Sequence, residues 1–287
     1  MPEQAPLSYL DHLRRCNQRD MSRFRPFVVA GERVGWIKEP FLSTLGEFPD
    51  LFQIDAHAVT LDPALATPEA RTKAVEPALR SLADEGLIHA WRDEPYPVVT
   101  EWGKPPLMEM ERAAAQHFGI RAFGVHLNGF VREGERISMW IGKRALDKPN
   151  YPGMLDNTVA GGQPAGLTLL ENLVKEAHEE AGIPEALARR AVAVGAISYT
   201  LETEEGLRPD TLFCYDLELE AGFVPRNLDG EIADFMLWPI ERVAGLVRHT
   251  FEFKFNCNLV VIDFLLRHGL IPRDHPEYRE LVEGLKG

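Results

Sequence analysis

The sequence contains few cysteines and no long apolar run. Cys16, Cys214 and Cys257 are odd in number, far apart in the chain and not arranged as CxxC pairs. This usage favours reduced thiols over a disulfide framework or a zinc site. No stretch approaches the roughly 18 apolar residues needed to span a membrane, and the first residues lack the apolar core of a signal peptide. We therefore expect a cytoplasmic protein that does not bind a membrane.

Positive charge is also scarce. The 287 residues include 31 lysines and arginines against 44 aspartates and glutamates, a formal net charge of −13. Nucleic-acid-binding proteins usually present a basic stripe, and none is visible, so nucleic acid is not expected as a partner. A small phosphorylated substrate is still compatible with this balance, because a bound metal ion can supply local positive charge.

The pattern of the chain changes near residue 118. Before it, residues 67–86 and 107–118 have the period of helices, and residues 52–61 resemble a strand. Pro77 should kink the first helix or divide it in two. We predict a smaller α+β region over residues 1–118 that shapes a substrate pocket or a homodimer contact.

The second part, residues 119–287, has the pattern of a larger α/β domain. A glycine-rich loop, residues 161–166, runs into a helix, and an apolar helix covers residues 256–269. Strands are expected around these helices at residues 122–131, 136–143, 193–200, 211–219 and 233–238.

Three acidic residues stand out on the helix that follows the glycine-rich loop. Glu176, Glu179 and Glu180 are spaced i, i+3 and i+4, which places their Cβ atoms roughly 5–6 Å apart on one helix face. Like charges at this spacing repel each other. Solvent, basic partners or a cation could neutralise them, and we expect Mg²⁺, with Mn²⁺ as the second choice, because both prefer oxygen ligands.

The ends of the same helix carry local signals. Thr168 and Glu171 have the spacing of a capping box, in which each side chain bonds the backbone N–H of the other residue. Gly182 is expected to end the helix in a left-handed conformation. We therefore assign Glu171 to architecture and not to the carboxylate cluster.

This stretch resembles the box of the Nudix hydrolase family, G-x5-E-x7-R-E-U-x-E-E-x-G-U, where U is aliphatic. Gly161 takes the place of the first glycine, and residues 175–183, KEAHEEAGI, match the second half. Leu167 stands where the first glutamate belongs, and Lys175 replaces the arginine. In the family those two side chains hold the loop and the helix together, so the two departures are mutually consistent.

The resemblance implies a fold and a set of roles. It implies an α/β/α sandwich with a mixed sheet, preceded here by the smaller α+β region. Glu176, Glu179 and Glu180 are implied to be metal ligands, and Glu179 and Lys175 occupy catalytic positions of the box. Gly161 and Gly162 are implied to line the substrate site.

Residues outside the box supply further candidates. Glu231, in a turn before a strand, is the first candidate for the general base or an additional metal ligand. Trp140, Lys143 and Arg144 lie on a strand that leads toward the loop, where they could stack on a substrate ring and contact phosphate. The second choice for the base is the acidic loop that contains Glu202, Glu204 and Glu205.

The phrases around residues 140–167, 227–239 and 253–271 resemble a narrower Nudix subgroup with an added N-terminal region. Its fungal and plant members are associated with thiamine pyrophosphokinase and act on thiamine diphosphate or its oxidised forms, releasing the monophosphate. The resemblance therefore implies Mg²⁺-dependent hydrolysis of a small organic diphosphate of this kind.

Two alternatives stay open. The box does not specify the organic group, so a nucleotide such as ADP-ribose is a second substrate class. Leu167 and Lys175 could instead mark a degraded box in a ligand-binding module without catalytic activity.

Overall fold

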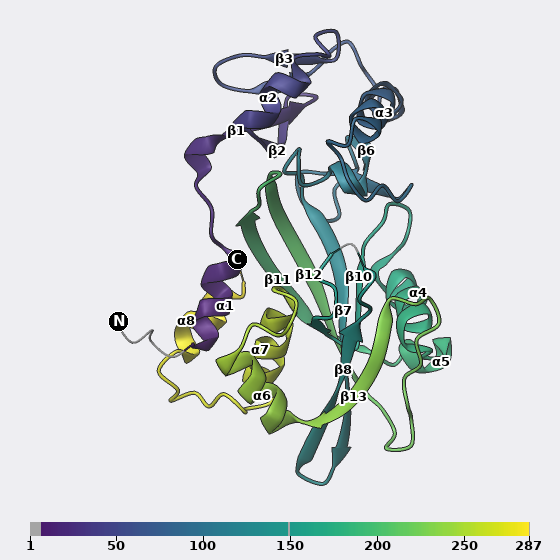
Figure 1. Cartoon of the computed structure of the whole chain (residues 1–287), viewed down its shortest axis with the longest axis vertical. Helices are drawn as coiled ribbons and strands as arrows, with labels where there is room; N and C mark the ends of the chain where they lie inside the picture. Colours follow the sequence, from purple (N-terminus) through teal and green to yellow (C-terminus); the bar gives the residue numbers. More distant parts are fainter. Residues whose placement is uncertain (1–6, 149, 287) are drawn as a thin grey trace.

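The computed structural model describes residues 7–148 and 150–286. It contains a larger domain built on one mixed sheet and a smaller region beyond one end of that sheet (Figure 1). No helix within the described ranges is both long enough and apolar enough to cross a membrane.

The main sheet has seven strands, ordered β11-β12-β7-β8-β13 along its main path, with β10 paired to β7 and β9 paired to β8. β12 and β7 run parallel, whereas the other neighbouring strands are antiparallel. The sheet is therefore mixed, as predicted. Its strands are β7 (Ala122–Glu133), β8 (Arg136–Arg144), β9 (Leu155–Asp156), β10 (Val159–Gly162), β11 (Val192–Glu202), β12 (Leu207–Glu218) and β13 (Ile232–Pro239).

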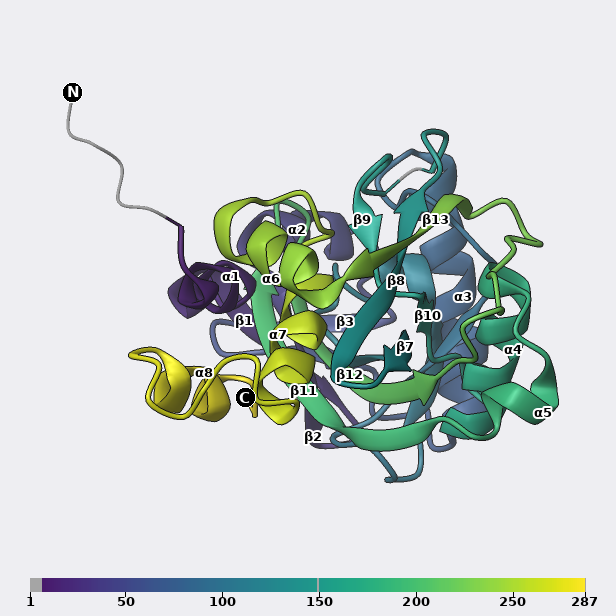
Figure 2. The same cartoon turned by 90° about the horizontal axis from the view of Figure 1, so that it is seen from below.

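Helices cover both faces of this sheet, as Figure 2 shows. One face packs against α4 (Leu169–Ala181) and α5 (Glu185–Ala188), and the other face packs against α6 (Ile240–His249) and α7 (Cys257–Arg267). In β7, every residue from Phe123 to Val131 is buried, because helices lie on both sides of the strand. The predicted α/β/α sandwich is confirmed.

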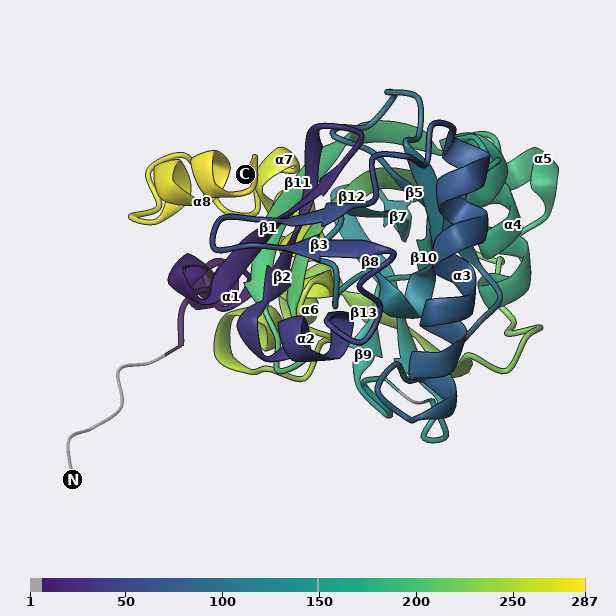
Figure 3. The ribbon, with the colours of Figure 1, turned by 90° about the horizontal axis from the view of Figure 1, so that it is seen from above.

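The N-terminal region has its own hydrophobic core around a four-stranded sheet ordered β2-β1-β4-β3 (Figure 3). Phe27 and Phe118 pack in this core with ring centroids 5.1 Å apart. The elements of the region are β1 (Phe24–Val29), β2 (Glu32–Lys38), α2 (Glu39–Leu45), β3 (Phe52–Ile54), β4 (Val59–Leu61), α3 (Pro68–Asp84), β5 (Pro95–Val98) and β6 (Met108–Glu111), with short 3-10 turns at Met21–Arg23 and Arg112–Ala114.

The prediction of a helix over residues 107–118 is wrong. The first half of this segment is β6, which pairs with β5 and buries Met108 opposite Val98 and Met110 opposite Tyr96. The residues are good helix formers, but tertiary packing of alternate side chains overrides that preference.

Two further expectations for the N-terminal region concern Pro77 and residues 52–61. Pro77 does not divide α3, which continues through it. Because proline has no N–H, the carbonyl of Lys73 loses its helical hydrogen-bond partner. Both residues are exposed to solvent. Residues 52–61 form two strands and not one, because Asp55 starts a turn by accepting hydrogen bonds from the N–H groups of His57 and Ala58.

The first helix packs in the core of the larger domain. α1 (Tyr9–Cys16) contacts α7 and α8 (Tyr278–Gly284), so this part of residues 1–118 packs against the sandwich and not in the N-terminal core. Cys16, Cys214 and Cys257 are all buried and free of disulfide bonds, as expected for reduced thiols.

Candidate active site

The carboxylate helix α4 begins and ends as predicted. The Glu171 backbone N–H donates to the Thr168 hydroxyl over 3.2 Å, and the Thr168 backbone N–H donates to the Glu171 carboxylate over 2.9 Å. Gly182 caps the other end in the left-handed conformation, with φ of 60°. Local sequence signals therefore fix the limits of this helix.

The loop before α4 is held by amides and not by a glutamate–arginine pair. The buried side chain of Gln163 donates to the carbonyl of Leu167 over 2.7 Å. Asn172, also buried, donates to the carbonyl of Gly162 over 2.8 Å. Leu167 thus needs no acidic side chain for the loop to be anchored to the helix.

Lys175 lies between two of the candidate metal ligands. Its ammonium nitrogen is 2.7 Å from a carboxylate oxygen of Glu179 and 3.2 Å from one of Glu176. Partial burial opposes protonation, but these two carboxylates raise the pKa of Lys175 above its ordinary value. The lysine therefore stays positively charged and neutralises part of the cluster.

Glu180 differs from its two neighbours because it is buried, with only 4% of the residue exposed. Its carboxylate accepts a hydrogen bond of 2.8 Å from the Ala160 backbone N–H. Burial, followed by the charges of Glu176 and Asp156, raises the pKa of Glu180 to about 8. Burial also raises the pKa of Glu176. The surroundings of these two side chains thus disfavour their ionised forms, and Glu180 is largely protonated at neutral pH.

This donor set fits a hard divalent cation. Carboxylate oxygens are the ligands that Mg²⁺ and Mn²⁺ prefer, and the crowding of Glu176, Glu179 and Glu180 is of the kind that a cation relieves. In the arrangement seen, no three Asp, Glu, His or Cys side chains of the described residues are grouped closely enough to hold an ion. The glutamate side chains must therefore change position, and Lys175 must release Glu176 and Glu179, before all three could ligate one ion.

The carboxylates face a cavity of about 250 Å³, here called the carboxylate cavity. Glu231 lines it together with the three glutamates, so the structure brings the first base candidate to the same site. Lys148 lies 2.5 Å and Arg92 3.8 Å from Glu231. Partial burial raises the pKa of Glu231, but the hydrogen bond and the charge of Lys148 lower it by more. The net effect is a lowered pKa, so Glu231 is ionised at neutral pH.

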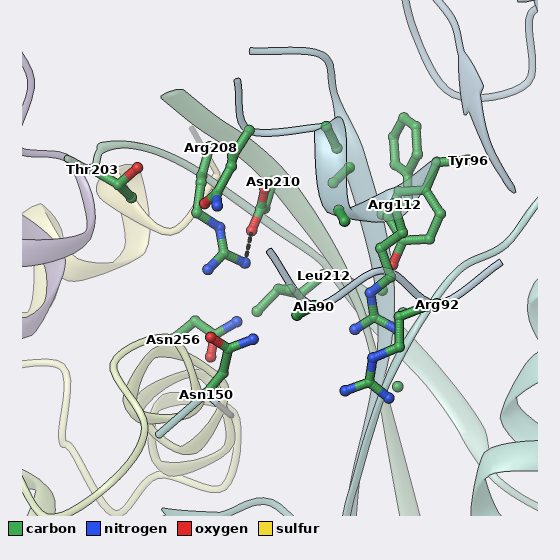
Figure 4. Close-up of a pocket in the computed structure, with 18 of the residues that line it drawn as sticks. Ala90, Arg92, Tyr96, Arg112, Asn150, Thr203, Arg208, Asp210, Leu212 and Asn256 are labelled. Atoms are coloured by element: carbon green, nitrogen blue, oxygen red, sulfur yellow. Dashed lines mark hydrogen bonds and ion pairs between the residues drawn. The ribbon is translucent and has the colours of Figure 1, made fainter. Parts of the chain in front are cut away.

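A second cavity of about 350 Å³, here called the adjoining cavity, is lined in part by residues of the N-terminal region such as Tyr96 and Arg112 (Figure 4). In Figure 4, Arg92 and Arg112 lie on one side of this cavity, and Arg208 pairs with Asp210 on the other. The residues that line both cavities are Arg92, Arg112, Asn150, Tyr151, Ala160, Gly161, Gly162, Arg208 and Lys254.

The predicted substrate contacts from β8 are largely incorrect. Trp140 is buried in the hydrophobic cluster between the sheet and α4, and Lys143 is exposed; neither lines the carboxylate cavity or the adjoining cavity. Arg144 lines the carboxylate cavity, but its guanidinium donates to Asp156 over 2.8 Å and to backbone carbonyls of the Asn150–Tyr151 loop. Because Trp140 is enclosed between the sheet and α4, its ring cannot stack on a ligand in either cavity.

The acidic loop of residues 202–205 does not reach the carboxylates. Glu202 is held 3.0 Å from Lys38 of the N-terminal region. Glu205 lines only the adjoining cavity and accepts a hydrogen bond of 2.7 Å from Gln116. Neither Glu202 nor Glu204 lines the carboxylate cavity. The structure therefore favours Glu231 over this loop as the candidate for the general base.

Sequence reasoning missed five of the basic side chains that line the carboxylate cavity. They come from loops and strand ends far apart in the chain, and no motif or spacing marks them. They can be recognised only in the folded structure, where this acidic chain gathers five basic side chains around the carboxylate cavity. These are Arg92, Arg112, Lys148, Arg208 and Lys254.

Comparisons with known proteins give matches to one family model and to three individual proteins. A family described as a domain of unknown function, DUF4743, matches residues 8–122. Nudix hydrolase 20, chloroplastic, and Nudix hydrolase 24, chloroplastic, both from Arabidopsis thaliana, are each 45% identical to the chain over 97% of its length and 77% of theirs. The uncharacterized protein YJR142W of Saccharomyces cerevisiae is 34% identical over 68% of this chain and 60% of that protein.

Solved structures align more weakly. The NUDIX domain of Shewanella oneidensis NrtR, complexed with ADP ribose, aligns with a TM-score of 0.41 and 11% identity over 52% of this chain and 90% of that chain. DR0079 from Deinococcus radiodurans aligns with a TM-score of 0.42 and 19% identity over 59% and 98% of the two chains. The matches to the Arabidopsis proteins are therefore the informative ones.

Proposed function

The chain belongs to the Nudix hydrolase family, and we propose that it uses Mg²⁺ to hydrolyse the diphosphate bond of a small organic diphosphate. The reaction class, hydrolysis of a phosphoanhydride bond by a metal-dependent enzyme, comes with the family. The proposed substrate is thiamine diphosphate or an oxidised analogue, and the proposed products are the monophosphate and phosphate.

The observation that carries this proposal is the mixed charge of the carboxylate cavity. The α4 glutamates line one side of it, and basic side chains that include Lys148, Arg208 and Lys254 line the rest. A diphosphate with bound metal ions needs both kinds of group, since carboxylates hold the metal and cations hold the phosphate oxygens that the metal leaves free. An acidic helix face alone would need no such basic surround.

Glu176, Glu179 and Glu180 would hold the metal. When bound, Mg²⁺ stabilises charge that develops on the phosphoryl oxygens and lowers the pKa of an attacking water. Lys254 lies 3.8 Å from the buried carboxylate of Asp156, which keeps this cation at the junction of the two cavities. Glu231, ionised and in the same cavity, is our proposed base.

The adjoining cavity supports a flat, polar organic group on the diphosphate. Apolar side chains such as Phe123 and Leu212 line it together with amide and hydroxyl groups of Asn150, Asn256 and Tyr151. This mixture suits a heteroaromatic ring, which presents apolar faces and polar edges. The choice of thiamine among such compounds rests on the sequence resemblance.

A substrate panel tests the proposal. Wild-type protein is assayed with Mg²⁺ for phosphate or monophosphate release from thiamine diphosphate, oxidised thiamine diphosphates and ADP-ribose. We expect the highest kcat/KM for a thiamine compound. Faster turnover of ADP-ribose than of every thiamine derivative would remove the thiamine assignment while leaving the reaction class intact.

A further inference from the structure

The region that matches a family of unknown function forms one wall of both cavities. We propose that this N-terminal region is the phosphate-binding half of the active site, and that Arg112 and Arg92 bind the diphosphate of the substrate. The inference rests on the proposed function for the identity of the ligand as a diphosphate. It gives residues 8–122 a role in the same reaction as α4.

The N-terminal region is built directly onto the glycine loop. The backbone N–H of Ala165 in the loop donates to the carbonyl of Pro95 in β5 over 2.8 Å. The Tyr96 hydroxyl lies against Gly162, in the space that a Cβ would occupy. Gly162 is thus required for close contact between the two parts, and this contact fixes side chains of β5 and β6 relative to α4.

Arg112 follows β6 and extends toward the glycine loop. Its guanidinium is 2.7 Å from the carboxylate of Glu94 and lies close to the position of a Cβ on Gly162. The side chain remains 40% exposed and lines both cavities. The planar guanidinium therefore keeps donors available for phosphate oxygens, to which arginine binds with two parallel hydrogen bonds.

The position of Arg92 is fixed by the buried carboxylate of Glu111, the residue that precedes Arg112 in the sequence. Glu111, only 8% exposed, accepts hydrogen bonds of 3.0 Å from the backbone N–H groups of Arg92 and Glu94. These bonds fix the backbone segment that carries the side chains of Arg92 and of Glu94, the partner of Arg112. The Arg92 guanidinium itself has a loose pairing, 3.8 Å from Glu231, and its side chain is 37% exposed. The backbone of Arg92 is therefore fixed in position, while its guanidinium keeps hydrogen-bond donors for a ligand.

A purely structural arginine in the same region looks different. Arg71 is 8% exposed, and its guanidinium donates to three backbone carbonyls, those of Leu65, Ala66 and Leu107. It lines neither cavity. Arg112 and Arg92 instead retain unused donors at a cavity that also holds the α4 carboxylates, which is what a phosphate ligand requires.

The test measures binding separately from turnover. Methylenediphosphonate, a diphosphate analogue that cannot be hydrolysed, is titrated with Mg²⁺ into the full chain by calorimetry. The variants are Arg112→Gln, Arg112→Lys and Arg92→Gln, each checked by thermal unfolding. Arg80→Gln is the matched control, because Arg80 belongs to the same region and pairs with Asp93 over 2.9 Å but lines neither cavity.

We expect Arg112→Gln and Arg92→Gln to weaken binding about 10- to 100-fold, the usual effect of losing hydrogen bonds to a charged group. Arg112→Lys should recover part of the loss, because it keeps the charge but not the planar fork. Substrate KM should rise in the same order. The Arg80→Gln control should bind like wild type.

Wild-type affinity in folded Arg112→Gln and Arg92→Gln proteins would overturn the inference, as would a wild type that does not bind methylenediphosphonate. If Arg112→Gln does not fold, Arg112→Lys and Arg92→Gln decide the matter. Wild type that binds the analogue in an arginine-dependent way but hydrolyses no diphosphate would contradict the proposed function and leave this inference standing.

Discussion

The carboxylate of Glu176 lies directly over Gly161, in the space that a Cβ would occupy. The first glycine of the box is therefore needed for clearance, and its backbone conformation is an ordinary one. Gly166, later in the same loop, is different: it has open space around it but a φ of +83°, which only glycine adopts readily. Two glycines of one loop thus serve different physical purposes.

The clearance at Gly161 predicts the effect of a single methyl group. Gly161→Ala should push the Glu176 carboxylate out of the cavity and lower kcat/KM about 100-fold, as expected when a catalytic group is misplaced by about 1 Å. Folding should be little affected, because the side chain of Glu176 is flexible. Steady-state kinetics and thermal unfolding measure the two effects. Gly245→Ala, in the helix α6 with nothing within 4 Å of the added Cβ, is the control.

The anchoring of the loop predicts that restoring the missing box acid brings no gain. Leu167→Glu should leave kcat and Mg²⁺ affinity unchanged, because Gln163 and Asn172 already hold the loop. Thr168→Ala should cost about 1 kcal/mol of unfolding free energy by removing the N-cap. Kinetics and urea unfolding test both statements. A large rise in activity for Leu167→Glu would mean that the native site is impaired.

The buried pair Arg144–Asp156 predicts a strong dependence of stability on one carboxylate. Asp156 is 1% exposed and also accepts a hydrogen bond of 2.7 Å from the Cys257 thiol. Asp156→Asn should lower the unfolding free energy by about 3 kcal/mol, because it leaves the buried Arg144 guanidinium without its counter-charge. Urea unfolding would show this, and a loss no larger than that of Asp234→Asn, at an exposed site on β13, would contradict it.

Burial of His117 predicts an acid-dependent loss of stability. Burial, assisted by the nearby charge of His89, lowers the pKa of His117 to about 4. The unfolded chain, with an ordinary pKa of about 6.5, binds the proton more readily, so stability is full above pH 6.5 and declines as the pH falls toward 4. Between pH 7 and pH 5, wild type should lose about 2 kcal/mol more than His117→Gln. Equal losses in urea unfolding would refute this assignment.

The sequence predicted the features that depend on neighbouring residues. The capping box of Thr168 and Glu171, the left-handed cap at Gly182 and the alternation of strands in the main sheet are local signals, and the structure contains all of them. The order of the three glutamates on α4 was also visible, since helical spacing alone sets it.

The remaining features depend on tertiary packing. Helical spacing does not show that Glu180 is buried beneath the Ala160 backbone whereas Glu179 is only partly buried, since the position of β10 decides this. The strand pattern of β8 predicts a ligand contact for Trp140 because that pattern does not reveal the helix covering this face. Arg112 and Lys254 are separated from the box by long stretches of chain, and only the folded cavity brings them to it.

The central claim is that the α4 carboxylates carry metal-dependent hydrolysis of a diphosphate. The direct measurement is formation of the monophosphate product with and without Mg²⁺ for wild type, Glu179→Gln and a control, Glu185→Gln, at an exposed position on α5 outside both cavities. The substrate is the panel diphosphate that wild type hydrolyses fastest.

We predict Mg²⁺-dependent turnover by wild type and by Glu185→Gln, and a loss of at least about 100-fold for Glu179→Gln, because metal-bound charge stabilisation contributes several kcal/mol. Binding without turnover for every diphosphate, or wild-type activity in Glu179→Gln, would contradict the claim.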